Sequence, residues 1–259
     1  MRNLVERRDL LFQLVRRDFE QRYIGSAMGW IWGLIQPLVL LLSWTFVFQG
    51  LLKQPHPGVE NYPLWLFAGM LPWLLFSETV QRSATCLLDH ANLITKTVFP
   101  AEIVPLSIFL SALVGHALAL GLLMAAVGVW LNHISVFLIL LPLYVFVIGL
   151  MAVGLGWIVA SLHVFLRDSA QVLSVILTFW FWLTPIFVPE DLYRRKAWTG
   201  HLLAANPMAY VVRGYRAMLI DSVPLSAADL GIAAAFGAAM FVAGGLFFRH
   251  MKRGFADVL

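Results

Sequence analysis

The chain has 259 residues, of which 61% are hydrophobic and only 12% are charged, whereas a soluble domain has about a quarter of its residues charged. This composition, with a mean hydropathy of +0.82, excludes an ordinary water-soluble protein. The single cysteine, Cys86, excludes an internal disulfide, and the net charge of +4 is spread around hydrophobic stretches, so we expect neither a structural metal site nor a nucleic-acid partner.

Residues 1–23 precede the first hydrophobic stretch and contain acids as well as bases, which is not the pattern of a cleavable signal peptide. Residues 4–20 show a helical period, with most apolar side chains on one face and most polar ones opposite. The pattern predicts an amphipathic helix that lies in the membrane interface. It serves either as a surface anchor or as a gate at the mouth of a pathway.

Six stretches with few or no charges follow, and a helix needs roughly 20 apolar residues to cross a bilayer. They cover residues 30–52, 62–77, 103–131, part of 134–166, 169–188 and 230–248. The second stretch is short. The sequence therefore predicts an all-α integral membrane protein with six transmembrane helices, in one domain over residues 1–259, with both termini on one side.

The positions of Lys and Arg give the expected orientation, because basic residues near the ends of spans stay in the cytoplasm. Most of the 18 basic residues lie on the side of the two termini, so we expect both termini to be cytoplasmic. The run Arg194, Arg195 and Lys196 is an exception, because it falls on the external side. We interpret it as lying near an anionic lipid surface.

Two connecting segments are long enough to have structure of their own. Residues 78–102 mix charged and apolar side chains and should form a cytoplasmic loop. Residues 190–229 should be external, but they contain apolar pieces at 202–205 and 209–219. Backbone at membrane depth needs protein or a water-filled cavity to cover it, so we expect short re-entrant helices here.

Gly25, Gly29 and Gly33 recur at four-residue spacing, which strips one helix face of side chains and permits close approach of another backbone. Three interpretations stay open. The glycines form a dimer face, a bend between the interfacial helix and the first span, or a packing groove within one chain.

Several aromatic side chains lie inside the expected spans, although Trp and Tyr favour the membrane interfaces. Trp44 and Phe48 share a helix face, as do Phe179 and Trp182. Such residues pack against neighbouring helices by default. They are also our candidates for the wall of a path along which sugar rings slide, because the apolar faces of sugars stack on aromatic rings.

No catalytic set is apparent. Asp89 and His90 are adjacent and lack a third partner, and the adjacent carboxylates Glu190 and Asp191 lack the separation that glycoside hydrolysis needs. The phosphate-binding pattern G-x-x-x-x-G-K-[ST] is missing. The chain is therefore expected to be a transport subunit and not an enzyme, and any ATP must be bound by another chain.

Several strings resemble those of polysaccharide-export permeases, the membrane subunits of type-2 ATP-binding-cassette exporters for O antigen, capsule or teichoic acid. In chain order they are RDFEQRYIGS at 17–26, LPW at 71–73, NLITKTVFPAEIVPL at 92–106, Arg167-Asp168, Thr184-Pro185-Ile186 and Asn206-Pro207-Met208. Together they span nearly the whole chain. The first and the fifth string are most similar to those of O-antigen permeases.

This resemblance implies a homodimer in the bacterial plasma (inner) membrane that pairs with two copies of a separate subunit, which binds ATP with Mg²⁺. This chain would bind no cofactor itself, and its substrate would be a lipid-linked glycan. Residues 1–23 would be a gate helix that meets the lipid headgroup, and residues 190–229 would narrow the exit. The implied headgroup residues are Arg16, Arg17, Arg22 and Tyr23, and the implied coupling residues on the ATPase-docking loop at 78–102 are Arg82, Asp89, His90, Asn92 and Lys96.

Three other functions compete with polysaccharide export. A type-2 exporter of drugs or small lipids shares the six-span plan but lacks the string at 92–106. A membrane-bound transferase needs polar side chains that converge near the spans, and a channel needs polar stripes along its pore. The sequence shows neither pattern, so a drug or lipid exporter is the leading alternative.

Overall fold

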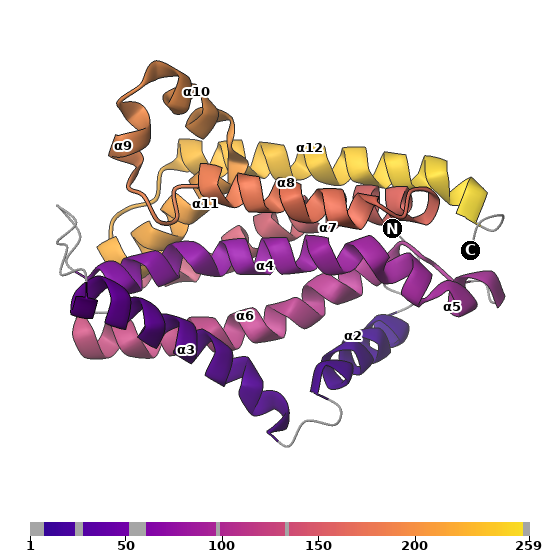
Figure 1. Cartoon of the computed structure of the whole chain (residues 1–259), viewed down its shortest axis with the longest axis horizontal. Helices are drawn as coiled ribbons and strands as arrows, with labels where there is room; N and C mark the ends of the chain where they lie inside the picture. The colour runs from indigo at the N-terminus through magenta and orange to yellow at the C-terminus, as the bar shows by residue number, and fades with distance from the viewer. Residues whose placement is uncertain (1–7, 24–27, 52–60, 97–98, 133–134, 256–259) are drawn as a thin grey trace.

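The computed structural model describes residues 8–23, 28–51, 61–96, 99–132 and 135–255, and all regular secondary structure within these ranges is helical. Figure 1 shows the long helices side by side along the longest axis of the molecule. Four helices have the length and composition to cross a membrane. They are α4 (Tyr62–Asp89), α6 (Ile103–Trp130), α7 (Leu141–Phe165) and α12 (Ala227–Met251). The expected all-helical membrane protein is thus confirmed at this coarser level.

Two apolar helices are shorter. α3 (Trp32–Thr45) continues into the π-helix η2 (Phe46–Leu51), and α8 has the bounds Ser169–Leu183. α3 follows a turn in which Gly29 has a φ of +53°, a conformation that favours glycine. This turn supports the interpretation of the glycines as a bend, although Gly25 lies outside the described residues.

Helix α4 is longer than the expected second span. Residues 78–89, which we expected in a loop, continue the helix to Asp89. Val80, Ser83, Ala84 and Leu87 are buried at spacings of three and four, which gives this segment a packing face. Pro72 lies inside the helix without ending it. The expected connecting segment is therefore reduced to the residues around α5 (Ala91–Lys96).

Helices α7 and α12 pack at close range through glycines. A Cβ on Gly154 would lie 2.5 Å from the carbonyl oxygen of Met240, and a Cβ on Gly244 would overlap the backbone of Gly154. Small residues bring helices this close in membranes, where van der Waals contact and not hydrophobic burial holds them together.

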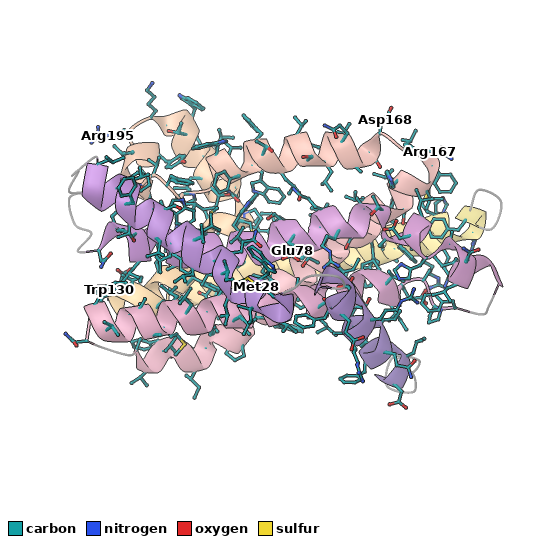
Figure 2. All side chains as sticks on the ribbon, turned by 60° about the horizontal axis from the view of Figure 1, so that its bottom comes forward. Met28, Glu78, Trp130, Arg167, Asp168 and Arg195 are labelled. Carbon is teal, nitrogen blue, oxygen red and sulfur yellow. The ribbon has the colours of Figure 1, made fainter. Side chains whose placement is uncertain are left out.

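The two ends of the bundle differ. The α5 end carries α5, the C-terminal segment, and a small core in which Phe255 is 2% exposed. The α9–α10 end carries α9 (Glu190–Arg194), α10 (Ala197–Ala205) and α11 (Pro207–Arg216). Figure 1 shows α9 and α10 projecting from the bundle, and Figure 2 shows Arg195 at this end with Arg167 and Asp168 at the other.

Short helices were expected between 190 and 229, and the structure has three there, followed by the π-helix η4 (Ala217–Asp221). Helix α11 packs against α4, α7 and α12. Met208, Val211, Val212 and Tyr215 are all 0% exposed, so α11 is part of the core.

Candidate functional site

An aromatic cluster at the α9–α10 end brings together three of the four expected channel residues. Phe187, which the sequence did not single out, has its ring centroid 6.1 Å from that of Trp44, 6.5 Å from that of Phe48 and 5.7 Å from that of Trp182. Trp182 is 60% exposed and stacks on Phe187 at an interplanar angle of 28°. The cluster thus joins the ends of α3 and α8.

Phe179 lies apart from this cluster. It is 67% exposed and lines an apolar groove with Leu202 and Ala205 of α10. Trp44 and Phe48 are half-buried, and both also contact rings at the start of α4. Trp44 and Phe48 therefore pack against neighbouring rings, whereas Trp182 and Phe179 are exposed at two separate places on the surface of the single chain.

Asn206 joins the end of α8 to the start of α11. Its side-chain oxygen accepts hydrogen bonds from Nε1 of Trp180 (2.9 Å) and from the backbone N–H of Met208 (3.0 Å). Its amide nitrogen donates to Oγ1 of Thr184 (3.0 Å) and to the carbonyl of Leu183 (3.2 Å). Both the donors and the acceptor of this buried amide are used, so its position is well determined.

Arg216 holds the turn that follows α8. Its Nη1 and Nη2 donate to the carbonyls of Pro185 (2.6 Å) and Ile186 (2.7 Å), and its Nε donates to the carbonyl of Trp65 (3.2 Å). The guanidinium carbon lies 3.2 Å from the centroid of the Trp65 ring. Burial lowers the pKa of Arg216 to about 9, so the side chain stays charged at neutral pH. The carbonyls of Pro185 and Ile186 lie outside the regular helices, and this one cation satisfies both, while Trp65 lies inside α4.

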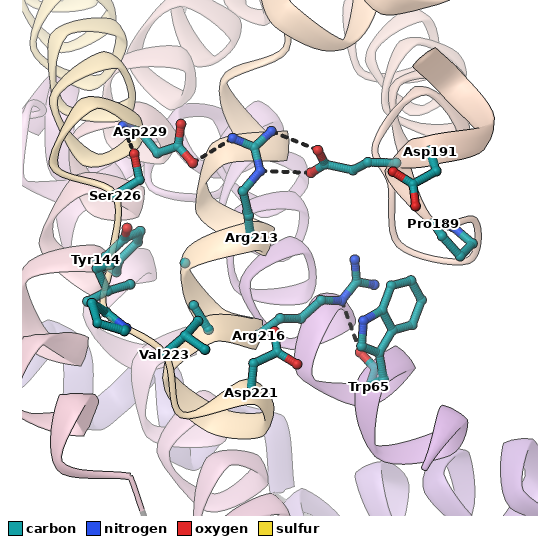
Figure 3. Close-up of a pocket in the computed structure, with 15 residues that line it drawn as sticks. Trp65, Tyr144, Pro189, Asp191, Arg213, Arg216, Asp221, Val223, Ser226 and Asp229 are labelled. Atoms are coloured by element: carbon teal, nitrogen blue, oxygen red, sulfur yellow. Dashed lines mark hydrogen bonds and ion pairs between the residues drawn. The ribbon is translucent and has the colours of Figure 1, made fainter. Parts of the chain in front are cut away.

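Arg213, one turn earlier on α11, connects three elements (Figure 3). It binds Glu190 through two hydrogen bonds of 2.9 and 3.0 Å and binds Asp229 of α12 at 2.5 Å. Burial alone would lower the pKa of Arg213, but the hydrogen bonds and charges of the two carboxylates outweigh it and raise this pKa. A two-pronged contact of this kind fixes geometry as well as charge. It ties α9 to α11 and α12.

A cavity of about 420 Å³ lies beside these two arginines. Figure 3 shows its walls, to which Trp65, Tyr144, Asp191 and Asp221 contribute with Arg213 and its partners. Burial raises the pKa of Asp221, and the charge of Arg216 partly offsets this effect. Two kinds of charged group therefore line the cavity. Arg213 and Arg216 already have partners, whereas Asp191 and Asp221 form no ion pair among the described residues.

The expected headgroup residues lie on or beside α2 (Arg8–Tyr23), away from this cavity. Arg16 is exposed and binds Glu20 at 2.8 Å, and Arg17 is exposed as well. Arg22 and Tyr23 belong to the helix, but their side chains lie outside the described part of the structure.

The expected coupling residues lie on two elements: the C-terminal part of α4 and the short helix α5. Arg82 does not point into a loop, because its Nη2 binds Asp18 of α2 at 2.5 Å and its Nη1 lies 3.6 Å from Glu78. Asp89 accepts a hydrogen bond from Thr85, and His90 contacts the carbonyl of Cys86 at the end of α4. Asn92 is exposed on α5, and the side chain of Lys96 is outside the described residues. Asp89 and Asn92 are both exposed, so another protein can reach these two side chains.

Sequence reasoning missed Phe187, Asn206, Arg213 and Arg216. A signal existed for three of them. Arginines inside the apolar segment 209–219 are costly at membrane depth and mark positions with specific partners. Asn206 before Pro207 has the pattern of a helix start. Phe187 carried no such signal.

In the described ranges, four apolar helices have the length and composition of membrane spans, as in a multi-pass membrane protein. The sequence profile described as "ABC-2 type transporter" matches residues 9–220, and the chain belongs to this family.

Individual relatives are similar over almost the whole chain. The O-antigen export system permease protein RfbA of Myxococcus xanthus is 30% identical over 99% of this chain and 98% of its own length. A protein of the same name from Klebsiella pneumoniae is 26% identical over 97% and 95%. The polysialic acid transport protein KpsM of Escherichia coli is 22% identical over 77% and 76%.

Proposed function

We propose that this chain is the membrane-spanning permease subunit of an ATP-driven exporter that moves a lipid-linked polysaccharide, O antigen, across the bacterial plasma membrane. The observation that carries the proposal is its near full-length similarity to two proteins named O-antigen export permeases. The aromatic cluster around Phe187 supports it, because aromatic rings offer a sliding sugar polymer weak contacts that do not depend on sequence.

The proposed topology has six spans. α3 with η2, and α8 with the turn at Thr184, complete the set of four long helices. Both termini and α5 then lie in the cytoplasm, and α9, α10 and α11 lie on the external side. Helix α11 is proposed as the re-entrant element, and its buried position inside the bundle supports this assignment.

The proposed assembly is a homodimer with two separate ATP-binding subunits, which hold ATP and Mg²⁺. The exposed side of α5, with Asn92, is the docking surface for the ATPase. Glu102 binds Lys252 at 2.7 Å and so links this region to the end of α12. A movement of α5 can reach α4, against which it packs, while the Glu102–Lys252 pair links the start of α6 to the end of α12.

The pair of Asp18 and Arg82 connects the proposed gate helix α2 to the α4 span. Both side chains are partly buried, at 31% exposed for Arg82 and 20% for Asp18. Asp18→Asn removes the charge and keeps the shape, so we expect it to reduce glycan at the cell surface by about threefold to tenfold. This corresponds to about 0.7–1.4 kcal/mol in the free energy that positions the gate helix.

Glu20→Gln on the same helix is the matched control, because Glu20 is 54% exposed and pairs only along α2. It should leave surface glycan unchanged at equal protein level. Equal effects of the two changes would contradict a specific role of the Asp18–Arg82 contact.

The proposed function is tested by deletion of the gene for this chain, followed by assays of lipid-linked glycan inside the cell and of glycan at the surface. Export predicts that full-length lipid-linked polymer accumulates inside while surface polymer disappears. If neither pool changes, polysaccharide export is wrong and an exporter of drugs or small lipids replaces it. If both pools disappear, the chain acts in synthesis.

A further inference from the structure

The cavity beside Arg213 and Arg216 has the composition of a binding site. We propose that it is an exit-side subsite that contacts a neutral or amino-bearing sugar polymer and disfavours acidic sugars. This inference rests on the proposed function and narrows its substrate class. The volume of about 420 Å³ falls within the range of about 300–1,000 Å³ that is usual for small-molecule sites.

An unsatisfied hydroxyl at the wall of the cavity indicates a ligand. Tyr144 is 0% exposed, and within the described part of the chain its hydroxyl has no hydrogen-bond partner. It packs against Gly214, where any side chain would overlap the phenol ring. Buried hydroxyl groups are almost always hydrogen-bonded, so this one calls for a polar group from outside the chain. A sugar hydroxyl supplies both a donor and an acceptor.

The charges of the cavity select among sugars. Its walls hold four carboxylates and two guanidinium groups, a formal charge of −2. Arg213 is committed to Glu190 and Asp229, and Arg216 to backbone carbonyls. The remaining carboxylates, on Asp191 and Asp221, accept hydrogen bonds from hydroxyl or ammonium groups and repel the carboxylate of an acidic sugar.

Two other ligands fit the cavity less well. A metal ion needs several ligands at one point, and no cluster of three or more His, Cys, Asp or Glu residues in the described ranges is arranged to hold one. A flat aromatic ligand would stack on Trp65, but the guanidinium of Arg216 already covers one face of that ring and Tyr62 is stacked on it as well. The polar groups of the cavity are therefore best suited to hydrogen bonds with a hydroxyl-rich or amino-bearing ligand.

The test uses the full chain in lipid nanodiscs and three probes, the hexamers of glucosamine, mannose and sialic acid. Saturation-transfer NMR, which detects weak binding, should show contact with the glucosamine and mannose hexamers, and about tenfold weaker binding of the sialic acid hexamer. Asp191→Asn with Asp221→Asn should strengthen binding of the sialic acid hexamer by about tenfold, to the level of the mannose hexamer, because the two charges that repel its carboxylates are removed.

Two further variants change the cavity itself, and a separate measurement checks that they fold. Val223→Trp fills the cavity from its exposed rim and should abolish the discrimination among the three probes, leaving only their weak contact with the aromatic cluster, with the retention volume of the protein as the check on folding. Tyr144→Phe should weaken the mannose hexamer by about threefold to tenfold through the loss of one hydrogen bond. Equal binding of all three hexamers, or binding that neither variant changes, would overturn the inference.

The inference and the proposed function fail in different ways. If gene deletion traps lipid-linked glycan inside the cell while the probes bind without discrimination, the export function stands and the charge-selective subsite is wrong. If deletion changes neither glycan pool, the proposed function fails and the subsite fails with it.

Discussion

Replacing Arg216 with Ala is expected to lower the free energy of unfolding by about 3–5 kcal/mol, the largest effect that the structure predicts for a single side chain. Two buried carbonyls outside the regular helices, on Pro185 and Ile186, lose their donor together, and Trp65 loses both a contact to its carbonyl and the cation on its ring. Each unsatisfied buried carbonyl costs about 1–3 kcal/mol, part of which water recovers at this end of the bundle.

Chemical unfolding in detergent, followed by tryptophan fluorescence, measures this change. Arg216→Lys should recover only part of the loss, because a single ammonium cannot span carbonyls that lie on different elements. Arg194→Ala is the control, since Arg194 is 63% exposed and its removal should change the free energy by less than about 0.5 kcal/mol.

Gly69→Ala probes the same contact without touching the arginine. The added Cβ would lie 2.5 Å from Nη2 of Arg216 and must displace the guanidinium from its place. Gly69→Ala is expected to destabilise the protein less than Arg216→Ala, because the displaced atoms are the end of a side chain and alanine favours the helix. An Arg216→Ala variant as stable as the Arg194→Ala variant would show that the carbonyls of the 185–186 turn do not need this cation.

Replacing Arg213 with Gln is expected to cost about 2–4 kcal/mol, because it leaves Glu190 and Asp229 facing each other without their shared cation. Their side chains are only 19% and 17% exposed, so water cannot fully replace the guanidinium. We expect α9 and the start of α12 to separate and the cavity between them to lose its shape. Surface glycan should fall in parallel.

Neutralising both carboxylates separates the repulsion between Glu190 and Asp229 from the loss of their hydrogen bonds to Arg213. Glu190→Gln with Asp229→Asn, added to Arg213→Gln, removes both carboxylate charges and should restore about half of the lost stability. If the triple variant is no more stable than Arg213→Gln alone, charge repulsion is not the cause. In that case the two-pronged hydrogen bond itself carries the stability.

The sequence was enough to predict an all-helical membrane protein, because each membrane span is recognised from its own run of apolar residues. Runs of apolar residues long enough for a bilayer predict spans wherever they occur, and positions 103–131 and 230–248 agree with α6 and α12 within a few residues. The short helices between 190 and 229 followed from apolar pieces in a polar connector. Motif strings, read in order, indicated the family that the profile match then confirmed.

The boundary of α4 was less accessible. A charge-based rule ends the second span at Ser77, but the helix continues to Asp89 because one face of residues 78–89 packs against neighbours. Arg82 consequently pairs with Asp18 of α2, whereas the sequence analysis predicted it in a loop that docks on the ATPase. Charged residues end an apolar stretch in a hydropathy profile. A helix can continue through them, because its end is set by where the backbone hydrogen bonding stops.

Composition and the local order of residues were enough to predict that the protein lies in a membrane, that it is helical, where most of its helices lie and to which family it belongs. Tertiary structure alone decided which side chains meet. Phe187 gathers aromatic rings from α3 and α8, and Arg213 joins residues 23 and 16 positions away. The physical reason is that helices apolar on every side reveal no packing face, so their partners are set by the fit between helices.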